Sequence, residues 1–292
     1  MKAWPDCLPC VLSLVISTAR RNGLDDERVR AVMERVLDAG IVSLGSFSHQ
    51  PSYDLAAAWR LLTDFTGEAD ALRKDKIRQN QQALLLYPEA HAYVVSAPDP
   101  LANALKLAIA GNMLDAVINV DTAAPDTLLR SLESLALDAE ELAELRRRLS
   151  SASSLVYLTD NCGEVVFDRL LLQVIRKNWI VETTVVVKET PTLNDVTMTE
   201  ALEVGIDHDC DRLLGNGTQE PLPSTDLSLV SDEVRKLVEG ASLIISKGIG
   251  NFEVLEEDPS VAGRITFLIH AKCTPMAALH GVREGSLILV NR

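Results

Sequence analysis

Apolar side chains recur at helical spacing through most of the first 150 residues. In the segment 8–21, for example, the apolar positions fall on one face of a helix. Asp25 is placed to cap the next helix, Pro88 is expected to end a later one, and Pro100 stands in a first turn, where proline is favoured. The helices that this pattern predicts span 8–21, 25–37, 54–65, 69–86, 99–110 and 139–149.

From residue 154 onward, short apolar runs alternate with helical stretches. Such alternation predicts parallel strands joined by crossover helices. We therefore expect an α/β fold, with a mainly helical N-terminal lobe (1–150) packed on a lobe (151–292) that contains a Rossmann-like, mostly parallel sheet. The segment 98–120 could pack with the sheet lobe instead. Strands are predicted at 154–159, 181–187, 242–246, 265–269 and 286–290, with a long loop at 215–231.

The composition narrows the class of protein. The chain has 292 residues, of which 47% are hydrophobic and 24% charged, as in ordinary soluble proteins. Its formal net charge of -14 argues against nucleic-acid binding, because no basic surplus exists to neutralise phosphates. The apolar runs are too short to span a membrane. We expect neither nucleic acid nor membrane as a partner, and the oligomeric state is not indicated.

The N-terminus and the cysteines favour a cytoplasmic location. Residues 1–9 lack the apolar core of a secretory signal. The five cysteines are an odd number, so a disulfide framework is not expected. Cys7 and Cys10 form a C-x-x-C motif, which is compatible with a zinc site or a redox pair. Packing of two small side chains is the favoured interpretation, and Cys162 is interpreted as a small space-filling residue.

Oxygen-bearing side chains follow two of the predicted strands. Asp160 and Asn161 come directly after the run 154–159, and Asn194 and Asp195 lie beyond the run 181–187. In open α/β sheets, ligands bind at the carboxyl ends of the strands. Carboxylate and carboxamide oxygens suit a hard divalent cation such as Mg²⁺ or Mn²⁺. A helix cap would explain one residue of the first pair but not both pairs, so a metal site is favoured.

Two acidic residues lie in the helix predicted to start at Cys162. Glu164 and Asp168 are four residues apart, so they share one face of that helix. Glu164 is a candidate general base or a partner that orients a metal ligand, although an acid in the first turn also complements the helix dipole. For Asp168, a structural hydrogen bond is the favoured role.

Lysines and glycines near strand ends predict a phosphate site. Lys188 and Lys247 each follow an apolar run, where a charge is unusual. Two glycines after Lys247 would let backbone N–H groups approach an anion near the start of a helix, expected at Asn251. The pair Gly111-Asn112 is a weaker candidate, because it would also serve as an ordinary C-cap. The candidate phosphate-binding residues are Lys188, Lys247, Gly248, Gly250, Asn251 and Asn112.

Several strings in one order resemble a known family. The segment 160–168, DNCGEVVFD, resembles the D-N-A-G-E-[IV]-V-F-D string of the DUF89 family, the damage-control phosphatases. Cys162 departs from this string, which usually has alanine or another small residue there. Other strings extend the resemblance over essentially the whole chain. They are CLPC at 7–10, the helix and A-G-N turn at 99–112, KETPTLNDVT at 188–197, SKGIGNFE at 246–253 and AKC at 271–273.

The resemblance implies a metal-dependent phosphatase. Such enzymes remove phosphate from small, often damaged or surplus, phosphometabolites with Mn²⁺, Co²⁺, Ni²⁺ or Mg²⁺. The family's metal ligands correspond to Asp160, Asn161 and Asp195, and its phosphate-binding lysine corresponds to Lys247. The expected partner is therefore a small phosphorylated metabolite such as a sugar phosphate or a nucleotide.

The expected reaction is hydrolysis of a phosphomonoester, with Asp160, Glu164 and Lys247 as catalytic residues. Glu164 is the best available base or water-orienting residue, and the metal would activate the attacking water. Attack by Asp160 itself, through an aspartyl phosphate, is an alternative route. Two other classes stay open, namely a Rossmann-like carboxyl methyltransferase and a non-catalytic metal- or nucleotide-binding protein. A single glycine after the strand, at 163, argues weakly against the methyltransferase.

Overall fold

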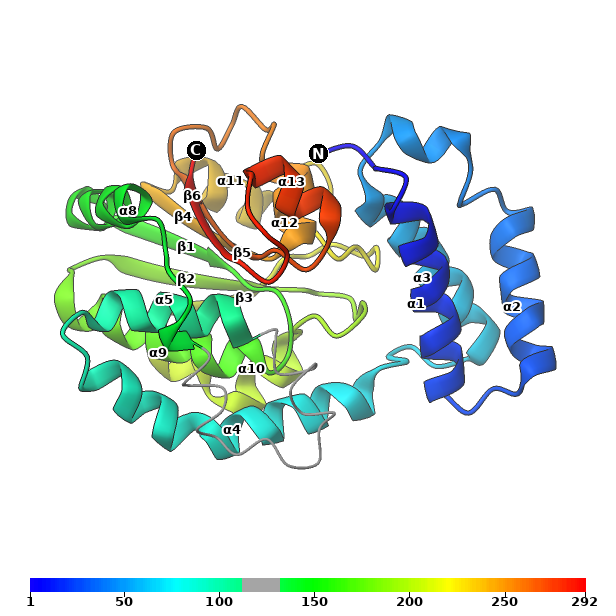
Figure 1. Cartoon of the computed structure of the whole chain (residues 1–292), viewed down its shortest axis with the longest axis horizontal. Coiled ribbons are helices and arrows are strands. Elements are labelled where there is room, and N and C mark those ends of the chain that lie inside the picture. The colour runs from blue at the N-terminus through cyan, green and yellow to red at the C-terminus, as the bar shows by residue number, and fades with distance from the viewer. Residues whose placement is uncertain (112–131) are drawn as a thin grey trace.

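In the computed structural model, which describes residues 1–111 and 132–292, a six-stranded sheet forms the centre of the C-terminal part of the chain (Figure 1). Its strands are β1 (Ser154–Leu158), β2 (Glu182–Val187), β3 (Arg212–Gly215), β4 (Leu243–Lys247), β5 (Ile265–His270) and β6 (Leu287–Asn291). Their order is β3-β2-β1-β4-β5-β6, and only the β5–β6 pair is antiparallel. The expected α/β class with a Rossmann-like, mostly parallel sheet is confirmed.

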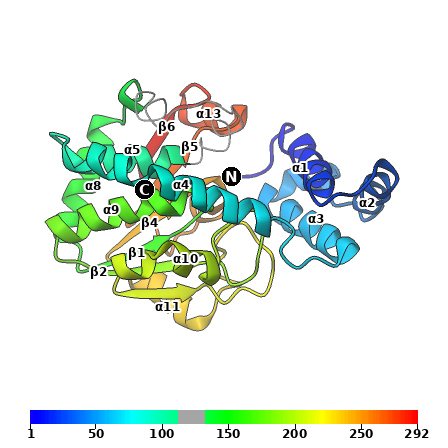
Figure 2. The same cartoon turned by 90° about the horizontal axis from the view of Figure 1, so that it is seen from below.

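Helices surround this sheet and form a separate group beside it (Figures 1 and 2). Across the described part of the chain, no helix has both the length and the apolar character needed to cross a membrane. The helices are α1 (Cys7–Arg21), α2 (Asp26–Asp38), η1 (Leu44–Ser48), α3 (Pro51–Thr66), α4 (Arg73–Val95), α5 (Pro100–Ala110), α8 (Ala139–Ser151), α9 (Glu164–Asn178), α10 (Met198–Val204), η3 (Ile206–Asp209), α11 (Asp232–Gly240), α12 (Ile249–Leu255) and α13 (Thr274–His280).

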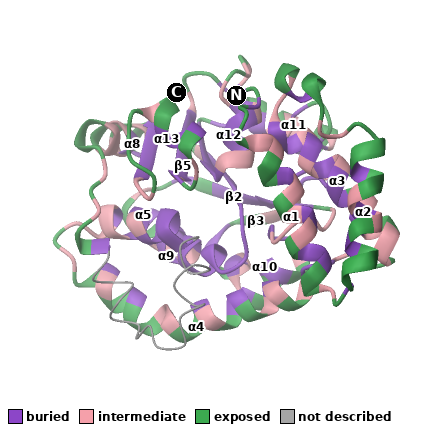
Figure 3. Cartoon of the chain, turned by 45° about the vertical axis from the view of Figure 1, so that its right-hand side comes forward, coloured by how far each residue is buried: buried purple, intermediate pink, exposed green. Residues whose placement is uncertain are grey.

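The central strands are apolar along their length because helices cover both faces of the sheet. Val185, Val186 and Val187 at the end of β2 are all buried, as is usual for parallel strands. One core lies between the sheet and α4, α5, α8, α9 and α10, and a second lies between the sheet and α11, α12 and α13. Figure 3 shows the central strands buried between these layers.

The first three helices have a core of their own. Val15 of α1, Val32 of α2 and Trp59 of α3 are buried together, and the last buried residue of this core is Leu72. Helices α4 and α5 instead share the core of the sheet. The change of core therefore falls near the start of α4, and α5 packs with the sheet. The division of the chain into lobes at residue 150 stays a prediction.

Two elements differ from the sequence expectation. Helix α4 continues through Pro88 and is bent along its length (Figure 1). Ala83 and Val94, on either side of the proline in α4, are buried in the core that α4 shares with the sheet. This packing maintains the helix although the proline removes one of its backbone hydrogen bonds. Strand β3 was not predicted, because it has only four residues and lies half-exposed at the edge of the sheet.

Candidate active site

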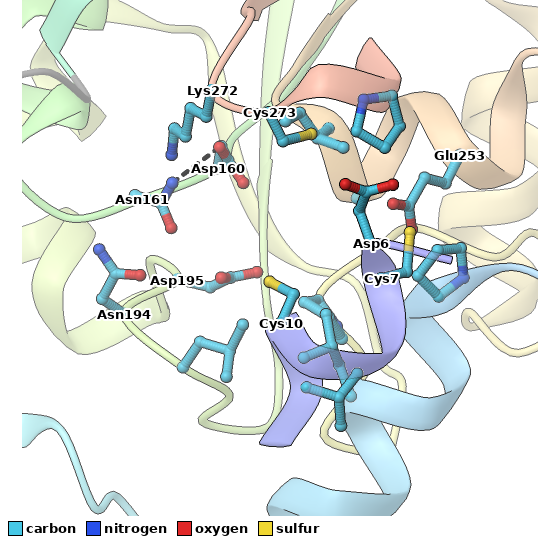
Figure 4. A pocket seen from close by; sticks show the side chains of 18 residues that line it. Asp6, Cys7, Cys10, Asp160, Asn161, Asn194, Asp195, Glu253, Lys272 and Cys273 are labelled. Atoms are coloured by element: carbon cyan, nitrogen blue, oxygen red, sulfur yellow. Dashed lines mark hydrogen bonds between the residues drawn. The ribbon is translucent and has the colours of Figure 1, made fainter. Parts of the chain in front are cut away.

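The candidate site lies at the carboxyl edge of the sheet, directly after β1. The Cys162 amide donates to the Asn194 carbonyl at 2.8 Å. The Val196 amide donates to the Asp160 carbonyl at 2.9 Å, so residues 160–162 and 194–196 form a short antiparallel bridge. This pairing joins the polar segments that follow two separate strands. The side chains that it brings together are Asp160, Asn161 and Asp195 (Figure 4).

Asn161 is oriented by two neighbouring carboxylates. Its amide nitrogen donates to Asp160 Oδ2 at 2.8 Å and to Glu164 Oε1 at 3.0 Å. Both amide hydrogens are thereby engaged, and the carbonyl Oδ1 is left as the acceptor that Asn161 offers to a ligand. Glu164 is buried and does not line the pocket that Asp160 and Asn161 line. Its geometry therefore fits the orienting role better than that of a general base.

A cavity of about 340 Å³ opens in front of these side chains (Figure 4). Loops at the edge of the sheet form one side of it, and α1 and α3 form the other. One end carries Asp160, Asn161, Asp195 and Lys272, whereas Asp6 and Glu253 lie at the other. The remaining wall is mainly apolar, with side chains that include Val11, Leu55, Leu193 and Ile249, and Cys10 lies between the two ends.

The two aspartates of this site have raised pKa values. Burial raises the pKa of Asp160 well above its ordinary range, and the neighbouring Glu164 and Asp195 carboxylates raise it further. Burial also raises the pKa of Asp195 to about 6. Asp195 Oδ2 is buried and accepts no hydrogen bond from the residues that the structure describes. The site therefore has more negative charge than the surrounding protein compensates.

The donor set fits a hard divalent cation. Two carboxylates and one carboxamide supply only oxygen ligands, as Mg²⁺ and Mn²⁺ prefer. Within residues 1–111 and 132–292, no group of three His, Cys, Asp or Glu side chains is arranged to hold a metal ion. Cys7 and Cys10 therefore belong to no preformed zinc cage in this part of the chain.

Lys247 lies in the protein interior next to the site and does not line the pocket. Its Nζ is 2.9 Å from Glu164 Oε2 and 2.8 Å from Asp168 Oδ1, and its side chain is buried. Tyr157 donates to the same Asp168 oxygen at 2.7 Å. Burial by itself would lower the pKa of Lys247, but the two carboxylates raise it above its ordinary value. This placement differs from the phosphate contact expected from the sequence, because both carboxylates engage the ammonium group.

The side chains of Lys188 and Asn251 also make their contacts within the protein interior. Lys188 Nζ lies 3.7 Å from Asp195 Oδ2 and 3.5 Å from Asn251 Oδ1. The Asn251 amide donates to the carbonyls of Thr159 at 3.2 Å and Lys247 at 2.8 Å. Neither side chain lines the pocket. Lys188 thus supports Asp195 instead of lining the pocket as a phosphate contact. Asn251 links the ends of β1 and β4 and does not line the pocket either.

The two glycines after Lys247 permit close approaches to other segments. Gly248 has a φ of +84°, and a Cβ at this position would overlap the Asp160 carboxylate. A Cβ at Gly250 would overlap the Pro223 carbonyl oxygen, and Gly250 lines the pocket. Helix α12 begins at Ile249, slightly earlier than expected. The two glycines therefore allow Asp160 and the loop that contains Pro223 to pack closely against the start of α12.

Lys272 is the lysine that faces the pocket. It follows β5, has an exposed side chain and lies near Asp160 in Figure 4. Its charge lowers the pKa values of Asp160 and Asp195, against the larger effect of burial. Lys272 was not among the site residues predicted from the sequence. Lys247 was selected because two glycines follow it and because the family resemblance assigned the phosphate-binding lysine to it, whereas Lys272 in the AKC string has no such glycines.

Known proteins resemble this chain over its whole length. The family model of the damage-control phosphatase ARMT1-like domain matches residues 3–288. The chain belongs to the DUF89 family of damage-control phosphatases. A damage-control phosphatase from Archaeoglobus fulgidus is 31% identical over 296 residues, which cover 99% of this chain and 98% of the relative. One from Pyrococcus horikoshii is 34% identical over 188 residues, which cover 63% of each chain.

The crystal structure of a DUF89 family protein from Pyrococcus horikoshii has the same fold. It superposes with a TM-score of 0.85 at 28% identity and covers 100% of this chain and 99% of its own. The names of these relatives support a phosphatase role in metabolite damage control for this DUF89 chain. Asn112, proposed from the sequence as a phosphate contact, lies outside the residues that the structure describes.

Proposed function

We propose that this chain is a divalent-metal-dependent phosphatase. Its substrate would be a phosphomonoester of a small, damaged or surplus metabolite, such as a sugar phosphate or a nucleotide. Mn²⁺, Mg²⁺, Co²⁺ or Ni²⁺ would be held by Asp160, Asn161 and Asp195. The convergence of these three oxygen ligands with Lys272 at one end of a single cavity is the observation that supports the proposal most strongly.

Each residue of this end has a distinct task in the proposed reaction. A bound divalent cation would supply Lewis-acid polarisation of the phosphoryl group. Lys272 would neutralise a phosphoryl oxygen as negative charge develops there. Asp160 would either attack phosphorus itself or hold the attacking water. Glu164 would hold Asn161 in position, and Lys247 would hold Glu164. Both are therefore positioning residues.

The turn after β1 gives the methyltransferase alternative little structural basis. In that fold class, backbone amides of a glycine-rich turn approach the cofactor. Here the Gly163 amide instead donates to Asn80 Oδ1 of α4 at 2.7 Å. The amide is therefore engaged inside the protein, and the phosphatase remains the function that the geometry supports best.

Hydrolysis of p-nitrophenyl phosphate tests the proposal directly. The protein would be dialysed against EDTA and assayed alone and with each of the four cations, with Asp195→Asn as the ligand variant. Asp232→Asn, an exposed acid on α11, is the matched control. We expect activity only with added cation and its loss in Asp195→Asn. Full activity after removal of the metal would refute the proposal, and a panel of sugar phosphates and nucleotides would then rank substrates.

A further inference from the structure

The end of the pocket opposite Asp160 is built around a buried carboxylate. Glu253, on α12, is only 6% exposed and lines the pocket. Its Oε2 accepts a hydrogen bond from the Ser52 amide at 3.1 Å. Ser52 lies in the first turn of α3, where backbone amides favour an anionic partner. The first turn of α3 therefore holds this carboxylate in a defined orientation at the pocket wall (Figure 4).

The charges along the pocket are unevenly distributed. Lys272 is the one Lys or Arg among the described residues that line it, and it lies at the Asp160 end. At the other end, Glu253 and the exposed Asp6 are the charged side chains that line the pocket, and the Met1 ammonium group donates to the Glu253 carbonyl oxygen. Burial raises the pKa of Glu253 to about 7, although the hydrogen bonds from Ser52 and the charge of the Met1 amino group oppose this. No Lys or Arg side chain among the described residues lines the pocket at this end.

A substrate would meet different chemistry at its two ends. The phosphate would lie with Lys272 and the cation, and the remainder of the molecule would lie along the apolar wall towards Glu253. A hydroxyl or ammonium group there could donate a charge-assisted hydrogen bond to Glu253. A second phosphate or a carboxylate would meet like charges in a partly desolvated space, which is unfavourable.

We propose that Glu253 is a specificity-determining residue that selects phosphomonoesters whose body carries an ammonium or hydroxyl donor and no second anion. This inference rests on the proposed phosphatase function and names the substrate class of the same site. Glu253 contacts the body of the substrate and takes no part in cleaving the phosphoester bond. Its effect lies in the choice of substrate.

Alkyl monophosphates with a terminal amino, hydroxyl or carboxyl group test this assignment. Chains of graded length would cover the span of the pocket, and the ratio of kcat/KM between amino and carboxyl compounds would be measured. Comparison of this ratio between proteins cancels the intrinsic reactivity of the esters. The variant is Glu253→Gln, which keeps an oxygen acceptor for the Ser52 amide, and the matched control is Glu257→Gln, an exposed residue four positions further on.

The wild-type protein should favour the amino over the carboxyl compounds by roughly tenfold or more, because only the amino compounds can donate a charge-assisted hydrogen bond to Glu253. Glu253→Gln should reduce this ratio by roughly tenfold, and Glu257→Gln should keep it. An equal ratio in wild type and Glu253→Gln, or equal use of both compounds by the wild type, would overturn the assignment of Glu253.

The controls separate this assignment from the phosphatase proposal. Hydrolysis of all three compounds with equal efficiency would count against Glu253 alone, because the phosphatase function would stand. Absence of hydrolysis of these compounds and of p-nitrophenyl phosphate with all four cations would overturn both. Hydrolysis of p-nitrophenyl phosphate alone would overturn the assignment of Glu253 and leave the phosphatase function standing. If Glu253→Gln fails to fold, the preference of the wild type and that of Asp6→Asn test the assignment instead. Removal of the Asp6 charge should also lower the ratio of kcat/KM between amino and carboxyl compounds.

Discussion

Lys247 Nζ lies 2.9 Å from Glu164 Oε2, and both side chains are buried. Glu164 in turn accepts a hydrogen bond from Asn161, so the lysine connects the end of β4 to a proposed metal ligand through one carboxylate. The charge of Lys247 is therefore part of the support of the site.

Replacement of Lys247 by methionine should destabilise the protein strongly. Two buried carboxylates would lose their counter-charge, and removal of one partner from a buried ion pair costs about 3–5 kcal/mol. Denaturant unfolding in the presence of EDTA measures this loss without a metal contribution. Lys236→Met, on the exposed side of α11, serves as the control and should change little. Equal stability of Lys247→Met and wild type would contradict the supporting role.

Lys272→Ala should affect activity and leave stability almost unchanged. Its side chain is exposed at the pocket, so its removal leaves no cavity. Loss of a charged donor that acts mainly in the transition state is expected to reduce kcat/KM by about 100-fold and to weaken inhibition by inorganic phosphate. Lys177→Ala, at an exposed position of α9, is the matched control. Normal phosphate inhibition of Lys272→Ala would place the phosphate elsewhere.

Added Mn²⁺ or Mg²⁺ should raise the Tm of the wild-type protein, because a ligand that binds only the folded state stabilises it. The increase should grow with cation concentration and should be absent from Asp195→Asn. Differential scanning fluorimetry on EDTA-dialysed protein records this without any substrate. Asp232→Asn should retain the full shift. A shift of equal size in Asp195→Asn would remove Asp195 from the set of ligands.

Gly248→Ala should impair the site beyond the cost of its backbone conformation. Gly248 and Gly263 both have positive φ, of +84° and +78°, but only at Gly248 would a Cβ overlap a side chain, that of Asp160. Gly263→Ala measures the cost of a positive φ without an overlap, about 1–2 kcal/mol. Gly248 also has a ψ of 167°, a region essentially restricted to glycine, so this further backbone strain adds to the overlap with Asp160. We expect Gly248→Ala to lose more stability than this and to lose the metal-induced rise in Tm. Equal effects of the two variants would show that Asp160 can move aside.

The pattern along the chain was sufficient to predict the fold class and most elements, because helix and strand periodicity reflects which faces of each element are buried. It also identified Asp160, Asn161 and Asp195 as candidates, since oxygen-bearing side chains after apolar strands are a local feature. The continuation of α4 through Pro88 and the short edge strand β3 could not be predicted in this way. Both depend on contacts with distant segments.

Only the tertiary structure decided what the lysines that follow apolar strands contact. Lys247 and Lys272 each come after an apolar run, yet the first is buried against Glu164 and Asp168, and the second is exposed at the pocket. The direction of a side chain at a strand end depends on the register of the sheet and on the helix packed against it. These partners lie 79 and 83 residues from Lys247, so no local pattern could reveal them.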